Sequence, residues 1–435
     1  MSSILISRLE PAVQKLALRV VGALLLVVGF YSANSRVLSL WLPFGNWENG
    51  GGDYVVLHAM ARGIVEGVNV YELNDPNVVG AGVVGMVYPP ATGFAVLPLA
   101  YLPFPVARAV FLLLSNLILI LGTRALVRRL APRSDAHVWV ISAGLVLLAA
   151  SIRWGMMLLQ IAPLMVGLLC FFIGALDRGH GRTAIAIATL ATALKMTLAL
   201  PFLGLLVLHR RFAGFGVAVG SWLVLNALGF LRMGDAAFST YQANVAKFEV
   251  VDASWNINGP DPWLGVSLPR LDWVFLLYGI IRDLPLSRLV SLFLAGATTL
   301  WLLREGWRFR HTPATLETTY LFLTPLVCLG SLAVYHHQYD ASLFLVPILL
   351  ACFLSPRLRQ PTWSAWLCGP LLFIVLLLPI GAAENVLDKL FGPTGVGLVK
   401  ISFPFAITLA LFGSLIFLHR NIEASAKLAG DLSGK

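Results

Sequence analysis

The stretch that organises the chain runs from Trp47 to Pro90. It opens as Trp47-Glu48-Asn49-Gly50-Gly51-Gly52-Asp53-Tyr54 and closes as Met86-Val87-Tyr88-Pro89-Pro90. It is the first long polar break in a sequence otherwise made of apolar runs, and its acid Asp53 directly follows three glycines. We therefore expect most of the remaining chain to form a membrane body that holds this loop in place.

The composition excludes an ordinary soluble domain. Of the 435 residues, 58% are hydrophobic and 12% are charged, and the mean hydropathy is +0.83, whereas soluble domains have about 25% charged residues. We predict an all-α polytopic membrane protein, with residues 1–435 forming a single integral membrane domain in contact with membrane lipids. The net charge of +10 does not indicate a nucleic-acid partner, because basic residues commonly flank membrane spans and no nucleic-acid-binding motif is present.

Apolar runs set the number of membrane spans. A helix needs about 20 mostly apolar residues to cross a bilayer, and by that rule the chain has about twelve spans, some of them short. The predicted spans are 18–40, 105–126, 138–153, 158–176, 183–196, 197–209, 213–231, 285–303, 315–335, 339–355, 364–381 and 400–418. Residues 88–102 are also apolar, but prolines interrupt them, so we expect a re-entrant or interfacial piece there.

The distribution of charge predicts the orientation. With a cytoplasmic N-terminus, most of the 31 lysines and arginines fall in inner loops, as the positive-inside rule requires. Most acids then lie outside, in two large outer loops at about 41–87 and 232–284. The chain has no Asn-x-Ser/Thr sequon, which fits a bacterial inner membrane. We therefore expect the working face of this multi-pass protein to be periplasmic.

A helix is predicted directly after the three glycines. Tyr54, Leu57, Ala61 and Ile64 recur at helical spacing, which indicates an amphipathic helix lying on the outer membrane surface with Asp53 at its N-cap. Two interpretations of Asp53 stay open at this point. Its carboxylate caps the helix, or it acts as a general base in the open space that the glycines leave beside it.

Two basic residues, Lys195 and Arg153, lie within or beside apolar runs. An intramembrane lysine such as Lys195 costs about 2.5–3.5 kcal/mol on insertion scales, so it should face a cavity or a partner. It could bind a lipid-linked phosphate as a point charge, or its ammonium could snorkel to the interface. Arg153 offers a second outer cation with the same two interpretations.

Polar residues also gather at a turn between two apolar runs, in the sequence Tyr335-His336-His337-Gln338-Tyr339-Asp340. Adjacent histidines on a helix point to different faces, which argues against a metal site. Hydrogen bonds to a phosphate or a sugar are favoured, and an interfacial role is the alternative.

The second outer loop carries flat aromatic and amide side chains at Trp255, Asn256, Asn258 and Trp263. Such side chains suit sugar faces and hydroxyls. They also suit a loop at the membrane surface, so both interpretations stay open.

In their order along residues 45–350, these motifs resemble those of the C-type (GT-C) membrane glycosyltransferases. They are most similar to glycosyltransferase family 87, the polyprenyl-phosphate-mannose-dependent alpha-mannosyltransferase-like group. The resemblance rests on Gly52-Asp53-Tyr54, Val70-Tyr71, Tyr88-Pro89-Pro90, 97–103, Gln160, the Lys195 segment ending in His209-Arg210-Arg211-Phe212, and His336-His337-Gln338-Tyr339-Asp340. The family often has Gly-Gln-x-Asn where this chain has Leu159-Gln160-Ile161-Ala162.

The resemblance implies a GT-C-like bundle whose first outer loop carries interfacial helices. It also implies an inverting transfer of a sugar, mannose by default, from a polyprenyl-phosphate donor to a hydroxyl of a glycolipid or glycan acceptor. By the same resemblance Asp53 is the general base, and no metal or other cofactor is needed. The residues expected at the donor phosphate are Lys195, His337, His336 and Arg153. The residues expected to contact substrate are Tyr54, Tyr88, Gln160, Trp255, Asn256, Asn258 and Asp340.

Other functions compete with this interpretation. A transporter or lipid flippase would also have about twelve spans and an intramembrane lysine, but transporters often show paired halves, and this sequence has no such symmetry. A ligase or polymerase using a diphosphate-linked oligosaccharide would favour arginine-rich outer loops, whereas these loops are rich in acids. Arabinofuranose, galactose and glucose stay open beside mannose.

Overall fold

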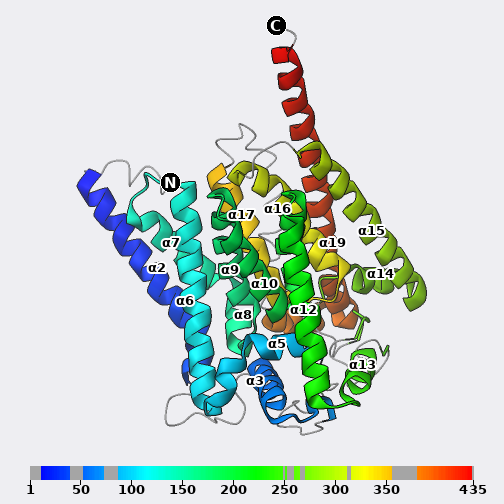
Figure 1. Ribbon diagram of the computed structural model, residues 1–435. Coiled ribbons are helices and arrows are strands. Elements are labelled where there is room, and N and C mark those ends of the chain that lie inside the picture. Colours follow the sequence, from blue (N-terminus) through cyan, green and yellow to red (C-terminus); the bar gives the residue numbers. More distant parts are fainter. Residues whose placement is uncertain are drawn as a thin grey trace.

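The computed structural model describes residues 11–39, 52–72, 87–247, 250–251, 259–264, 270–310, 315–354 and 380–433. These residues are almost entirely helical (Figure 1). The first elements are α2 (Pro11–Ser39), α3 (Gly52–Glu66), η2 (Val70–Glu72), α5 (Pro90–Ala95), η3 (Leu97–Tyr101), α6 (Phe104–Leu130), α7 (Ala136–Leu148), α8 (Ala150–Leu158), α9 (Ala162–Asp177) and α10 (Gly181–Leu194). They are followed by α11 (Met196–Leu208), α12 (Phe212–Met233), α13 (Ala237–Lys247), α14 (Trp273–Ile281), α15 (Leu284–Arg308), α16 (Leu316–Ala333), η4 (Gln338–Phe344), α17 (Leu345–Leu354) and α19 (Ile380–Ser433).

Six helices of the described residues are long and apolar enough to cross a membrane. They are Ala12–Ser35, Phe104–Leu130, Phe212–Met233, Leu284–Arg308, Leu316–Ala333 and Thr394–Asn421. The bent pair of α7 and α8 makes a seventh if it crosses as one span, and four shorter apolar helices overlap predicted short spans. The chain is therefore a helical membrane protein. The count of about twelve spans stays a prediction, and predicted span 364–381 falls almost wholly outside the described residues.

The predicted span 138–153 contains a bend of 64° between α7 and α8. The extended residue Ala149 separates these two helices. A second break follows at Leu159, whose φ of 54° is left-handed, and α9 begins only at Ala162. A third break lies at the extended residue Lys195, between α10 and α11. Non-helical backbone is tolerated at membrane depth only where protein or a water-filled cavity surrounds it. The three breaks therefore indicate a candidate site in the interior of the bundle.

Close helix packing holds these breaks in a fixed frame. A Cβ on Gly122 of α6 would lie 2.4 Å from the carbonyl oxygen of Gly167 on α9. In return, a Cβ on Gly167 would lie 2.3 Å from the carbonyl oxygen of Ile118. Small residues at such crossings let two helix backbones approach closely in a membrane. Helix α9 is therefore seated firmly against α6, immediately beyond the break at Leu159.

Helix α3 forms where the spacing of apolar residues predicts it. The side chains of Tyr54, Leu57, Ala61 and Ile64 are all buried, and the opposite face carries an exposed ion pair between Arg62 and Glu66. The apolar face, however, packs against α5 and η3 rather than against lipid. The location of this helix at the outer membrane surface stays a prediction.

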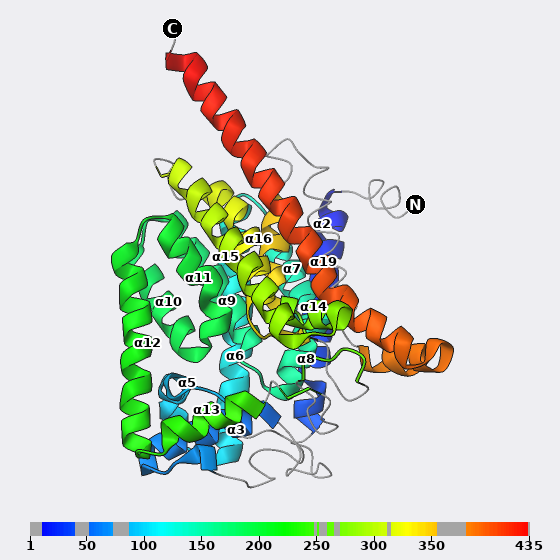
Figure 2. The same cartoon turned by 90° about the vertical axis from the view of Figure 1, so that its right-hand side faces the viewer.

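Helices α3, α5 and α13 lie at the lower end of the bundle (Figure 1), where η2 packs against α13 and η3 against α3, so that the five elements form one layer. Residues 88–102 are divided between the short elements α5 and η3, which confirms that they do not form one continuous span. The backbone N–H of Ala91 in α5 donates to Asn226 Oδ1 on α12 at 2.9 Å. Helix α13 packs against η2 and lies at the same end of the bundle as α3 (Figure 2). The second predicted outer loop therefore contributes one helix, α13, to the layer that holds Asp53.

Candidate active site

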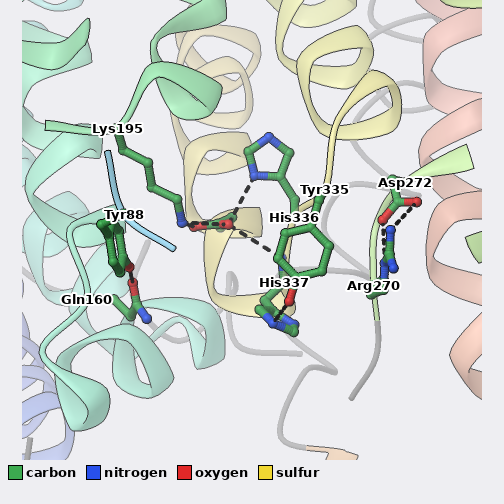
Figure 3. Close-up of polar contacts among 9 residues, drawn as sticks. Tyr88, Gln160, Lys195, Arg270, Asp272, Tyr335, His336 and His337 are labelled. Atoms are coloured by element: carbon green, nitrogen blue, oxygen red, sulfur yellow. Dashed lines mark hydrogen bonds and ion pairs between the residues drawn. The ribbon is translucent and has the colours of Figure 1, made fainter. Parts of the chain in front are cut away.

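Side chains from the breaks at Leu159 and Lys195, from α3, and from the segments that lead into α5 and η4 meet in one polar cluster. We use "polar cluster" for Asp53, Tyr88, Gln160, Lys195, Tyr335, His336, His337, Tyr339 and Asp340. Figure 3 shows the residues that extend from Tyr88 across to His337. Segments far apart in the sequence thus supply one site.

Lys195 is positioned by the break that it occupies. Because its backbone is extended between two helices, its side chain leaves the helix surfaces and enters the polar cluster. Its ammonium lies 2.9 and 3.0 Å from the two carboxylate oxygens of Asp340 and 5.4 Å from the ring centre of Tyr339. The predicted need for a partner is therefore met by an acid rather than by snorkelling.

Asp340 lies in the first turn of η4 and is buried. Besides Lys195, its carboxylate meets His336 Nδ1 at 3.0 Å and the backbone N–H of His337 at 3.4 Å. Both oxygens therefore already have protein partners, so Asp340 orients Lys195 and His336. Its predicted contact with substrate stays a prediction.

Asp53 lies in the first turn of α3, because the helix begins at Gly52 rather than after an N-cap aspartate. A negative charge there stabilises the helix dipole, but the carboxylate has no hydrogen-bond partner among the described residues. Although Asp53 is partly exposed, its dense protein surroundings raise its pKa to about 6. The charge of Lys195 opposes this rise and that of Asp340 adds to it, so the three charged groups act on one another.

Tyr88 and Gln160 form a second arm of the polar cluster. The Tyr88 hydroxyl donates to Gln160 Oε1 at 3.3 Å. Burial raises the pKa of Tyr88, and the charges of Asp53 and Asp340 raise it further, so the phenol lies within electrostatic reach of both acids. Gln160 is only 1% exposed, and its Nε2 has no partner within the described structure. Buried polar groups are normally hydrogen-bonded, so this amide is a donor available to a ligand.

On the other side of the cluster, two residues of the second outer loop support the histidines. The Arg270 guanidinium pairs with Asp272 at 2.8 and 3.0 Å and lies 4.6 Å from the ring centre of Tyr335. The Tyr335 hydroxyl in turn forms a hydrogen bond with His337 Nε2. The sequence interpretation missed this support, although Asp272 directly before the apolar run 273–281 is a typical helix N-cap signal.

The sequence of this chain is similar to one family of known proteins. The chain matches the model of Glycosyltransferase family 87 over residues 86–333, which is more than half of its length. The protein belongs to glycosyltransferase family 87. No match to a curated protein was found. A family 87 enzyme is a glycosyltransferase, so its substrates are a sugar donor and an acceptor, and the transporter interpretation is not favoured. The matched residues include Gln160 and Lys195, whereas Asp53 precedes them.

The remaining predicted site residues of this family 87 protein lie outside the polar cluster or outside the described residues. The Tyr54 ring is fully buried and stacks on Phe111, with ring centres 4.9 Å apart, so it packs in the core beneath α3. Arg153 is exposed on α8, and it has no ion-pair partner in the described part of the chain. Trp255, Asn256 and Asn258 lie outside the described residues. The roles of all five in substrate binding stay predictions.

The two adjacent histidines turn to different partners. His336 meets Asp340, and His337 meets Tyr335. Among the described residues of this glycosyltransferase, no three His, Cys, Asp or Glu side chains converge as metal ligands would. Whether the reaction needs a metal is not tested by this arrangement, and metal independence stays a prediction.

Proposed function

We propose that the protein transfers a sugar, with mannose favoured, from a polyprenyl-phosphate donor to a hydroxyl of a glycolipid or glycan, with inversion at the anomeric carbon. The observation that carries the proposal is the pairing of two groups in the polar cluster. Asp53 is a carboxylate without a hydrogen-bond partner among the residues that the structure describes, and Lys195 is a cation held within its electrostatic reach. A transferase using a phosphate leaving group needs a base on one side of the sugar and positive charge on the other.

In this proposal Asp53 takes the proton of the acceptor hydroxyl as that oxygen attacks the anomeric carbon. The bond between the anomeric carbon and the phosphate oxygen breaks on the opposite face, and its electron pair leaves with the phosphate. Attack and departure on opposite faces invert the configuration. A pKa of about 6 leaves Asp53 mostly ionised at neutral pH yet more basic than an ordinary aspartate. A positioned base typically contributes about 10²–10⁴-fold.

Lys195 is the proposed partner of the leaving phosphate. An ammonium group has three N–H donors, and the two oxygens of Asp340 engage it from one side. We assign the remaining donor to a phosphate oxygen of the donor substrate. His337 and His336, and then Arg153, are the further groups proposed to offset the charge that develops on the phosphate. No step in this scheme calls for a metal or a cofactor.

The proposed location is a bacterial inner membrane, with the polar cluster open to the periplasm. Support comes from the basic inner loops and from the lack of glycosylation sequons. The side chains of α12 and α15 that face outward are largely apolar, including Leu223, Leu228, Leu292 and Phe293. Such faces would place the polyprenyl chain of the donor in lipid beside the bundle.

The donor and the stereochemistry can be tested together. Membranes containing the protein would receive polyprenyl phosphates carrying labelled mannose, arabinofuranose, galactose or glucose, with a native lipid extract as acceptor. The proposal expects transfer, greatest from the mannose donor, and an anomeric configuration in the product opposite to that of the donor by NMR. A product that retains the configuration would refute the single-displacement mechanism. Label that crosses the membrane while still attached to polyprenyl phosphate would support a flippase.

A further inference from the structure

We propose that Tyr71 is a positioning residue for sugar transfer, which acts by holding Tyr88 in place against Gln160. This inference rests on the proposed function, because it concerns the same polar cluster. Tyr71 lies in η2, outside the cluster, and contacts none of the charged groups described above. Its effect would pass through the backbone of Tyr88.

A chain of hydrogen bonds carries the argument. Asn244 Nδ2 on α13 donates to the backbone carbonyl of Tyr71 at 3.0 Å. The Tyr71 hydroxyl donates to the backbone carbonyl of Tyr88 at 2.9 Å, and the Tyr88 hydroxyl donates to Gln160 Oε1 at 3.3 Å. Asn244, Tyr71 and Gln160 are all buried. These bonds therefore connect the surface helix α13 to the break between α8 and α9.

Tyr88 is a residue that needs such an anchor. It lies outside any helix and directly precedes Pro89 and Pro90, which have no backbone N–H to donate. The bond from Tyr71 joins two points 17 residues apart and fixes the backbone from which the Tyr88 phenol extends. If Tyr88 rotated, its bond to Gln160 would be lost. The Nε2 of Gln160, which has no partner in the described part of the chain, would then no longer be held at one place in the site.

The surroundings of Tyr71 separate the role of its hydroxyl from that of its ring. The ring packs against Phe230 and Tyr241, with centres 5.9 and 5.3 Å apart. A Tyr71→Phe protein keeps these contacts and loses the hydroxyl. Tyr241 belongs to the same aromatic group, but its hydroxyl has no hydrogen bond within the described structure. Tyr241→Phe is therefore a matched control for the loss of a phenolic hydroxyl at this place.

The test is a double-mutant cycle on the purified full-length protein. Apparent kcat and donor KM would be measured with labelled polyprenyl-phosphate-mannose and lipid extract for the wild type, Tyr71→Phe, Tyr88→Phe, Tyr71→Phe/Tyr88→Phe and Tyr241→Phe. We expect Tyr71→Phe to lower kcat about tenfold while donor KM changes by less than about twofold, because the lost contact is not with the donor. Tyr241→Phe should match the wild type. In a Tyr88→Phe background the second substitution should have no further effect, since coupled residues are not additive.

A role in folding alone gives a different pattern. The inference is overturned if Tyr71→Phe and Tyr241→Phe have the same kcat, or if the losses from Tyr71→Phe and Tyr88→Phe multiply. Either result leaves the proposed function standing, because the wild type still transfers sugar. If the wild type transfers no sugar from any polyprenyl-phosphate donor, the proposed function fails, and the role of Tyr71 in it fails with it.

Discussion

Lys195 holds its ammonium 2.9 and 3.0 Å from the two carboxylate oxygens of Asp340, although 145 residues separate the two in the sequence. The pair joins the break between α10 and α11 to the first turn of η4. Both charges also act on the Asp53 carboxyl, in opposite directions. Substituting Lys195 and substituting Asp340 should therefore shift the pKa of Asp53 in opposite directions.

The first prediction concerns pH. The base must be ionised, so kcat/KM of the wild type should fall as the pH drops through about 6, the pKa of Asp53. Lys195→Met removes the cation that lowers this pKa, so the acidic limb should move to higher pH. Asp340→Asn removes an anion that raises it, so the limb should move to lower pH. The measurement is the pH profile of kcat/KM, which reports the free enzyme. Shifts of both variants in the same direction would contradict the arrangement.

The second prediction separates stability from activity. Removing one partner of a buried ion pair typically destabilises a protein by about 3–5 kcal/mol, because the other charge stays buried. Lys195→Met should therefore lower the midpoint of thermal unfolding. Adding Asp340→Asn removes the stranded charge, so the double variant should regain much of the midpoint. It should not regain the wild-type rate of transfer, because the cation for the leaving phosphate is still missing. A double variant that recovers the wild-type rate would remove Lys195 from the proposed mechanism.

The third prediction compares two helix caps. Asp272 caps α14 by accepting from the N–H of Phe275, and Asp283 caps α15 by accepting from the N–H of Leu286. Only Asp272 also pairs with a buried arginine in the described structure. Losing a cap costs about 1 kcal/mol, whereas removing one partner of a buried ion pair costs about 3 kcal/mol or more. Asp272→Ala should therefore lower the unfolding midpoint clearly more than Asp283→Ala does. Equal losses would show that Arg270 does not depend on its partner.

Local sequence signals predict α3, α5 and η3 well. The apolar spacing after Asp53 defines α3, and the prolines between 88 and 102 divide that stretch into α5 and η3. In both places the signal is local, since a helical repeat or a missing N–H acts within a few residues. The packing of α3 on α5 was not foreseeable, because an apolar face fits a protein neighbour as well as it fits lipid.

The breaks inside the apolar body were harder to predict. Ala149 and Leu159 are ordinary apolar residues in apolar runs, and Pro163 marks only the start of α9 after the second break. When every face of a helix is apolar, periodicity gives no information about where it bends. The bend of 64° after α7 is therefore set by packing in the assembled bundle.

The sequence predicts those site residues that are charged or polar within or between apolar runs. Lys195 and the histidine turn stand out for that reason, and the structure brings them together. Tyr71 and Arg270 do not stand out, because their importance lies in bonds to residues far away in the sequence. The burial of Tyr54 and the exposure of Arg153 likewise depend on which face of a helix meets the core.

The most direct test of the account is sugar transfer by Asp53→Asn. Membranes with equal amounts of wild type, Asp53→Asn and Glu66→Gln would receive labelled polyprenyl-phosphate-mannose and lipid extract. Glu66 lies on the exposed face of the same helix, so its variant controls for a lost carboxylate on α3. We expect Asp53→Asn to lose about 10²–10⁴-fold of the wild-type rate, and Glu66→Gln to keep that rate. Equal transfer by Asp53→Asn and the wild type would contradict the assignment of Asp53 as the base.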